Sequence, residues 1–171
     1  MPESEYAGSG SPRAPGPTDS TFFGFEADFV ESLRCIPMAV RLRLDVTGVK
    51  MKLNEWSKLT QPERLDLALG PCATAEEIRI YREEVSALVE KTSGARPSML
   101  SELPEPAWED SSRVPGQVLD QARALGLDLP LSTWASLRPL QRFALVKLSR
   151  PGHENRNFLP AVKEFGLAPQ A

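Results

Sequence analysis

Few side chains in this chain could carry redox, metal or acid–base chemistry, and the candidates are Cys35, Cys72 and His153. Both cysteines come just before segments that are predicted to begin helices, where aligned backbone dipoles lower a thiol pKa. One hypothesis is therefore a thiol-based metal or redox carrier that uses Cys35 and Cys72. The alternative, which we favour, is that each cysteine is a small buried apolar residue, as most free cysteines are.

A closed zinc or iron–sulfur site needs about four ligands, and two cysteines with one histidine cannot supply them in a single chain. His153 follows Pro151 and Gly152, and we expect a surface or capping residue there rather than a ligand or an acid–base group. The sequence contains no glycine-rich phosphate loop, nucleophile elbow or two-histidine zinc helix. We therefore predict no catalytic residue and no bound cofactor, with an enzyme of another kind as a weaker alternative.

The composition narrows the class of protein further. The chain has 171 residues, of which 41% are hydrophobic, and this suits one ordinary globular domain. A net charge of −3 argues against nucleic-acid binding. No apolar run approaches the roughly 20 residues that span a bilayer, and two cysteines imply no disulfide framework. We expect a soluble, cytoplasmic protein that binds neither nucleic acid nor membrane.

A segment that occurs twice in the sequence supplies the elements that must position these residues. The two copies are offset by a constant 78 residues, so that Pro37 of the first corresponds to Pro115 of the second. The first copy spans 36–67 and the second 114–145. The shared residues are those that fix backbone and packing, which predicts a duplicated structural unit. The matched pairs are Pro37 and Pro115, Val40 and Val118, Gly48 and Gly126, Leu53 and Leu131, Trp56 and Trp134, Leu59 and Leu137, Arg64 and Arg142, and Leu67 and Leu145.

Each copy is predicted to begin with a helix after its proline and to end that helix at Gly48 or Gly126. The alternating stretches 49–53 and 127–131 indicate extended chain, and the two could pair with each other. Asn54 and Ser132 are then predicted N-caps of a short helix that carries the tryptophan.

A further helix follows in each copy, with a capping box from Thr60 to Glu63 in copy one. A second capping box, from Thr74 to Glu77, opens the helix expected over 75–91. Its shorter counterpart in copy two is expected over 157–165. We expect Trp108 to pack the linker onto the body, because an indole buries about 200 Å².

Together these patterns predict an all-α, compact helical domain built from two tandem copies of a helix–short helix–helix unit. Residues 1–21 are rich in Pro, Gly and Ser and are predicted to be a disordered tail. The predicted single domain covers 22–171, with repeat one at about 36–91, a linker at about 92–112 and repeat two at about 113–166.

The stretch from Phe23 to Leu59 resembles a small bacterial family named for its association with assimilatory nitrate reductase. The residues that carry the resemblance are Phe25, Glu26, Asp28, Phe29, Val30, the run Ser-Leu-Arg-Cys-Ile-Pro-Met at 32–38, Arg41, Leu44, Asp45, Gly48 and Trp56. The resemblance implies a non-catalytic accessory or maturation factor. Its partner would be nitrate reductase, an enzyme with a molybdenum cofactor and iron–sulfur clusters, and it would support assembly or cofactor insertion.

An accessory protein of this kind would bind its partner through apolar anchors and arginines, as most interfaces do. The N-terminal part of the resembling stretch supplies both kinds of side chain. Our candidates for partner-binding residues are Phe25, Phe29, Arg34 and Arg41.

Overall fold

The structure is a computed structural model that describes residues 21–27 and 33–168, with the side chains of residues 153 and 154 left out. Residues 1–20 of the predicted tail, Phe29 and the His153 side chain therefore lie outside what is described. The secondary structure of the described residues is helical, with no β-strand among them, which confirms the all-α part of the predicted fold class. None of the helices in these residues is long and apolar enough to cross a bilayer.

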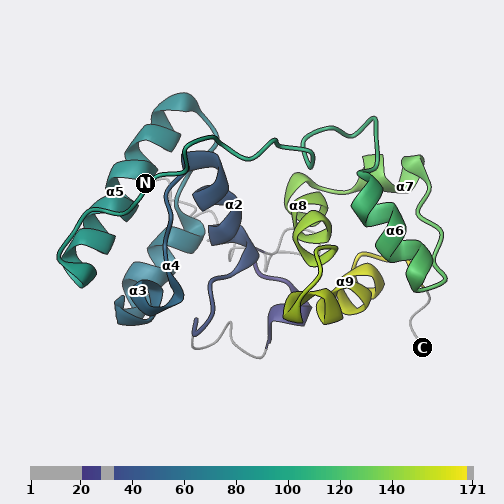
Figure 1. Cartoon of the computed structure of the whole chain (residues 1–171), viewed down its shortest axis with the longest axis horizontal. Helices are drawn as coiled ribbons and strands as arrows, with labels where there is room; N and C mark the ends of the chain where they lie inside the picture. The colour runs from purple at the N-terminus through teal and green to yellow at the C-terminus, as the bar shows by residue number, and fades with distance from the viewer. Residues whose placement is uncertain (1–20, 28–32, 169–171) are drawn as a thin grey trace, which may run out of the picture.

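The α-helices form two groups, which we call the N-terminal and C-terminal halves (Figure 1). The N-terminal half contains α2 (Met38–Thr47), α3 (Leu53–Lys58), α4 (Gln61–Leu69) and α5 (Ala75–Ser93). The C-terminal half contains α6 (Gly116–Ala124), α7 (Leu131–Ser136), α8 (Pro139–Leu148) and α9 (Phe158–Glu164). Two 3-10 helices, η1 (Gly24–Glu26) and η2 (His153–Asn157), precede α2 and α9.

Local sequence signals set several of these helix ends. Thr60 and Thr74 accept hydrogen bonds from the N–H groups of Glu63 and Glu77, as the predicted capping boxes require. Gly48 follows α2 at φ 75°, and Gly126 follows α6 at φ 70°. This left-handed conformation costs a glycine little and ends each helix.

The predicted N-caps Asn54 and Ser132 are wrong. The short helices begin at Leu53 and Leu131, with Lys52 and Pro130 as the N-caps. In α3 the Glu55 carboxylate accepts from the Lys52 N–H at 2.7 Å. The capping contact thus comes from a side chain three residues inside the helix, and Asn54 is not needed for it.

The extended stretch after Gly48 does not pair with its counterpart in the C-terminal half. Val49 instead forms an isolated antiparallel bridge with Met99 in the linker. The Lys50 N–H donates to the Ser98 carbonyl at 3.0 Å, and the Leu100 N–H donates to the Gly48 carbonyl at 2.7 Å. The linker therefore supplies the backbone partner that we expected from copy two.

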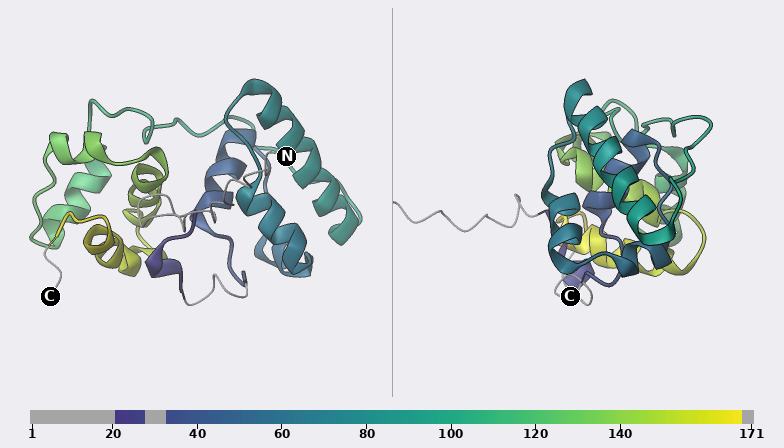
Figure 2. Two further views of the ribbon diagram at one scale, coloured as in Figure 1. Left: turned by 180° about the vertical axis from the view of Figure 1, so that it is seen from behind. Right: turned by 90° about the vertical axis from the view of Figure 1, so that its left-hand side faces the viewer.

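Two clusters of buried residues form the core. Trp56 centres the cluster of the N-terminal half and Trp134 that of the C-terminal half, and both rings are completely buried. Helix α2 serves both, because Val40 belongs to the first cluster and Met38 to the second. Helices α2 and α8 lie side by side at the centre, in Figure 1 and from behind in Figure 2.

The segment before α2 lies against α9 of the C-terminal half (Figure 1). The ring of Phe23 stacks on Phe25 at 5.1 Å and meets Phe165 edge-on at 5.1 Å. The Glu164 carboxylate accepts from the N–H groups of Gly24 and Phe25. The first described residues are therefore bound to α9 and to Phe165, which follows it.

Glu26 joins this segment to α2. Its carboxylate is buried and accepts from the Met38 N–H at 2.7 Å and from the Phe23 N–H at 3.1 Å. The first contact satisfies a backbone donor at the start of α2 that no residue inside the helix can pair. Burial raises the pKa of the Glu26 carboxyl, and the two backbone hydrogen bonds oppose that rise.

Candidate functional site

A cavity lies where the two halves meet, and we call it the central cavity. Its volume is about 520 Å³, within the range of about 300–1,000 Å³ that is usual for binding pockets. Helix α2, the segment 49–53, the linker and α8 all contribute to its walls. The lining residues are Cys35, Ile36, Arg41, Leu44, Asp45, Val49, Lys50, Met51, Leu53, Leu100 and Lys147.

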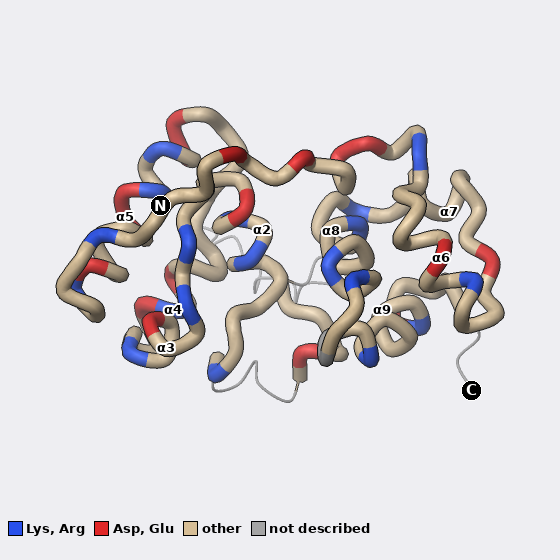
Figure 3. The backbone as a smooth tube through the Cα atoms, in the orientation of Figure 1, with Lys and Arg blue, Asp and Glu red and all other residues tan. Residues whose placement is uncertain are grey.

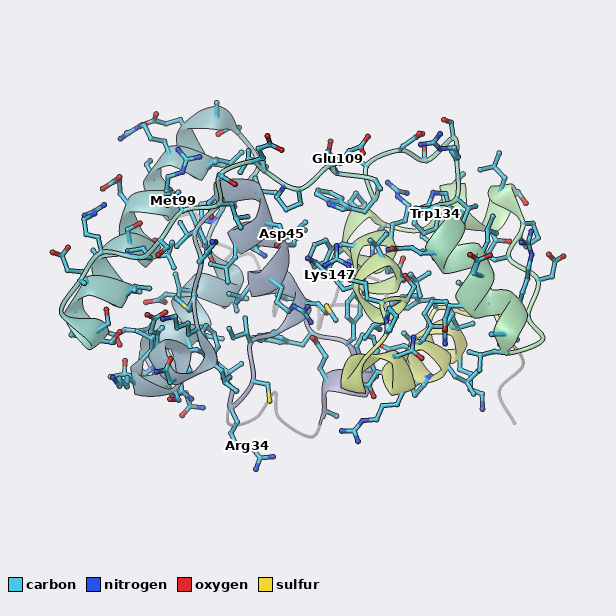
Figure 4. The ribbon with its side chains drawn as sticks, viewed as in Figure 1. Arg34, Asp45, Met99, Glu109, Trp134 and Lys147 are labelled. Atoms are coloured by element: carbon cyan, nitrogen blue, oxygen red, sulfur yellow. The ribbon has the colours of Figure 1, made fainter. Side chains whose placement is uncertain are left out.

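An ion pair between the two halves forms part of the wall. Lys147 Nζ of α8 lies 2.6 Å from Asp45 Oδ2 of α2, and Figure 4 shows the two side chains pointing toward each other. The side chain of Lys147 is only 10% exposed and that of Asp45 23%. The Lys147 Nζ also lies 5.2 Å from the centre of the Phe143 ring, a favourable cation–π distance. The pair therefore fixes α8 against α2 in a largely desolvated setting.

Further cations lie nearby. Arg41 is half-buried in α2 and Lys50 is exposed in the segment that follows it. Figure 3 shows basic positions on both α2 and α8, where these helices lie side by side. Three cationic side chains and one carboxylate thus line the cavity, although the chain as a whole has a net charge of −3.

Two residues singled out from the sequence, Cys35 and Arg41, both line the central cavity. Cys35 is exposed. The structure places the predicted partner-binding residues Phe25 and Arg34 elsewhere, and Phe29 lies outside the described residues. Phe25 packs half-buried on Phe23 and Phe165, and Arg34 projects outward from the body (Figure 4).

Cys72 lines a different cavity of about 390 Å³, together with Arg43 of α2 and Trp108 of the linker. Burial raises the pKa of the Cys72 thiol, the opposite of the lowering expected at a helix start. The thiol lies two residues before the N-cap of α5, and the positive charge of Arg43 offsets only part of the rise in its pKa. No group of three potential metal ligands forms among the residues that the structure describes.

Strained backbone precedes Cys35. Leu33 has φ 51°, a left-handed conformation that costs a branched residue about 1–2 kcal/mol. Its carbonyl accepts from the Trp56 indole N–H at 2.7 Å and from Arg64 at 3.2 Å. The buried tryptophan and the arginine of the repeat therefore hold the chain that leads into the cavity wall.

Trp108 packs as the sequence predicts. Its ring meets Phe143 edge-on at 5.9 Å, and its carbonyl accepts from Arg142 Nε at 2.7 Å. The linker is thereby attached to α8 beside the cavity-lining Lys147.

Sequence reasoning did not identify Lys147, Lys50 or Met51 as site residues. A signal for Lys147 was present, because this lysine lies in the otherwise apolar run Phe143–Leu148, in a helix whose other residues are mostly buried. A charge in such a run must find a partner, and that partner, Asp45, is far away in the sequence.

Comparisons with known proteins complete this description. Neither the curated proteins nor the solved structures gave a match. A protein-family model, described as conserved nitrate reductase-associated protein, matches residues 22–165. That range runs from the segment on α9 through both halves to the end of α9, and it contains every residue that lines the central cavity. The chain therefore belongs to the nitrate reductase-associated protein family.

Proposed function

We propose that this protein is a non-catalytic accessory factor that binds assimilatory nitrate reductase and supports its assembly or the insertion of its cofactors. The observation that carries the proposal is the family match over residues 22–165. The protein would act in the cytoplasm, where it would meet the nitrate reductase polypeptide before that enzyme is complete.

The central cavity supports a binding role. Its walls combine apolar side chains with charged groups that have little freedom, such as the Lys147–Asp45 pair. Preorganised apolar and charged groups give affinity at a low entropic cost, because little has to be ordered on binding. A partner surface would therefore find a formed site rather than one that must be assembled.

The first test is genetic. Deletion of the gene should abolish or strongly reduce nitrate reductase activity and lower the molybdenum content of the enzyme, and the wild-type gene should restore both. A gene that encodes the Cys35→Ser, Cys72→Ser double variant should restore them equally, because the proposal needs no thiol chemistry. Failure of this variant alone would favour the thiol-carrier hypothesis.

The second test is physical. Purified protein should bind the cofactor-free form of nitrate reductase in a pull-down, and it should bind the complete enzyme less tightly. Normal activity and normal cofactor content in the deletion strain, with no binding to either form of the enzyme, would end the proposal.

A further inference from the structure

We propose that an exposed side of α4 binds an amphipathic helix of the partner polypeptide, in the way that α8 packs against α2 within this chain. This inference rests on the proposed function and adds a place of binding outside the central cavity. Three observations carry it: the apolar side chains exposed on α4, the helix that covers the corresponding side of α8, and the charged outer side of α6.

Helix α4 exposes residues whose counterparts in α8 are buried. Offset by 78 positions, Leu65 corresponds to Phe143 and Leu69 to Lys147. Leu65 is 41% exposed and Leu69 56%, whereas Phe143 and Lys147 are both buried. The two leucines are four residues apart, so they are neighbours on one side of the helix. We call the side of α4 that carries Leu65 and Leu69 the open face.

The C-terminal half shows what covers the corresponding side of α8. Helix α2 packs against α8 there. Met38 and Leu42 of α2 pack in the cluster of the C-terminal half, and Asp45 of α2 pairs with Lys147. These three residues of α2 recur at i, i+4 and i+7, which is the spacing of one stripe along a helix. An amphipathic helix therefore occupies the position that is open beside α4.

The helices that join the two halves form one series of contacts. Helix α4 packs against α2, α2 against α8, and α8 against α6. By the offset of 78 positions, the contact of α4 with α2 corresponds to that of α8 with α6. Helices α2 and α8 each have a helix of the series on two sides, whereas α4 and α6 each have one. A further helix on the open face would continue the series.

The other end of this series carries charges instead of apolar side chains. The residues of α6 that correspond to Leu42 and Asp45 of α2 are Asp120 and Arg123. Both are exposed, and their charged groups lie 3.6 Å apart. A second copy of the chain would continue the series only by placing this pair against two leucines, which would desolvate both charges without a new partner. The open face is therefore left to a helix of another polypeptide.

The open face also defines the stripe of the helix that it binds. In the contact of α8 with α2, Lys147 meets the acidic Asp45, but α4 has Leu69 at the position of this lysine. A carboxylate opposite a leucine would lose its hydration without gaining a partner. The helix bound by α4 should therefore have apolar residues at i, i+4 and i+7, with no acidic residue at the last of these positions.

The first experiment uses a matched pair of variants at exposed leucines. Leu69→Lys gives α4 the residue that α8 has, and it should leave the thermal melt unchanged because this position is exposed. It should weaken binding of the full chain to cofactor-free nitrate reductase by about tenfold or more, as loss of an interface anchor does. Leu131→Lys makes the same change in α7, away from the open face, and should bind like the wild type.

The second experiment tests the specificity of the open face with two fluorescent synthetic helical peptides. One peptide has leucine at i, i+4 and i+7, and the other has aspartate in place of the last leucine. The wild-type chain should bind the leucine peptide about tenfold more tightly, as measured by fluorescence anisotropy. Leu69→Lys should reverse this preference, because the new lysine can pair with the aspartate as Lys147 pairs with Asp45.

Equal binding of the two peptides by the wild type, no binding of either, or the same preference in Leu69→Lys would overturn the inference. Two further measurements identify other occupants. A dimer that sediments in the wild type but not in Leu69→Lys would show that a second copy covers the open face. Tighter binding of the leucine peptide after deletion of residues 1–20 would show that the tail of the chain covers it. Either result would also overturn the inference.

The two proposals fail differently. If the protein binds nitrate reductase and Leu69→Lys binds it equally well, the inference about the open face is wrong and the proposed function stands. If nitrate reductase is not bound but the two peptides show the expected preference and its reversal in Leu69→Lys, the proposed function is wrong and the inference about the open face stands.

Discussion

In the N-terminal half the Trp56 indole donates to the Leu33 carbonyl at 2.7 Å, and in the C-terminal half Trp134 donates to the Asp110 carbonyl at 2.9 Å. Both rings are completely buried. Each short helix ends in the same extended conformation, at ψ 148° for both Leu59 and Leu137. The two tryptophans at matched positions thus both donate to a backbone carbonyl, 23 residues earlier for Trp56 and 24 residues earlier for Trp134.

The helix that follows differs between the halves. In α4 only Leu67 and Ala68 are buried, whereas in α8 every residue from Arg142 to Leu148 is buried. Helix α8 packs against α2, α6 and α9 and so lies inside the molecule. The helix that follows the tryptophan can therefore lie at the surface in one half and at the centre of the molecule in the other, depending on which helices pack against it.

Replacement of the two tryptophans gives the largest expected effect and tests whether the frame is equivalent. Trp56→Ala and Trp134→Ala should each lower the free energy of unfolding by about 3–5 kcal/mol, because each leaves a cavity and removes a hydrogen bond to a backbone carbonyl. Urea denaturation measures both. Trp108→Ala, at a half-buried ring, is the control and should cost less. A nearly neutral result at Trp56 or Trp134 would break the comparison.

Substitution of the matched arginines, Arg64 and Arg142, should sharpen the comparison between the two halves. Arg142→Met should cost about 2–3 kcal/mol, because the carbonyls of Trp108 and Leu137 lose a charged donor in a buried setting. Arg64→Met should cost less, about 1 kcal/mol, because the Leu33 carbonyl keeps the Trp56 indole as a donor. The same denaturation experiment compares them, and a larger loss at Arg64 would contradict the difference in burial.

Variants of the Lys147–Asp45 pair test the junction between α8 and α2, where corresponding residues of the two copies differ. Lys147→Leu should cost about 2 kcal/mol, because it leaves Asp45 with little access to water. Adding Asp45→Leu to that variant should restore most of the loss. Leu69→Lys, at the exposed corresponding position of α4, should change stability by less than about 0.5 kcal/mol. An additive double variant would show that the pair is not coupled.

The buried carboxylate of Glu26, which joins the N-terminal segment to α2, has no counterpart in copy two, and the pH dependence of stability tests its contribution. Burial raises the pKa of Glu26 above 4.5, so the folded state binds this proton more readily than the unfolded chain. The contribution of Glu26 to stability therefore increases as the pH falls from neutrality toward 4.5, and it is lost as the pH rises through the raised pKa.

Glu26→Gln should remove that contribution, which is measured as a smaller gain in unfolding free energy between pH 7 and pH 5. Glu63→Gln is the control. The Lys91 ammonium lowers the pKa of Glu63 to about 2, so its contribution is present above 4.5 and is lost only as the pH falls through about 2. A wild-type pH response in Glu26→Gln would show that this carboxylate does not titrate differently on folding.

Removal of residues 1–20 is expected to have the smallest effect. Its composition predicts that this segment buries too little apolar area to offset the entropy of ordering it. The melting temperature of the shortened chain should therefore equal that of the full chain. A clear decrease would mean that the segment contributes to the core of one half.

The sequence alone determined the helices and their ends, because these depend on residues within a few positions of one another. The capping boxes at Thr60 and Thr74, the left-handed glycines 48 and 126 and the helix expected over 75–91, observed over 75–93, are all of this kind. It also determined that both repeat tryptophans are core residues. The predicted N-caps Asn54 and Ser132 were wrong because the short helices begin at Leu53 and Leu131, with Lys52 and Pro130 as the N-caps.

The tertiary structure decided everything that joins distant segments. It placed α2 beside α8, bound the first described residues to α9, paired Val49 with the linker and brought Lys147 to Asp45. None of these contacts produces a periodic pattern in the sequence, because each depends on how the apolar faces of separate segments pack against one another. The central cavity exists only at that junction, so its residues could be recognised as neighbours only once the chain was folded.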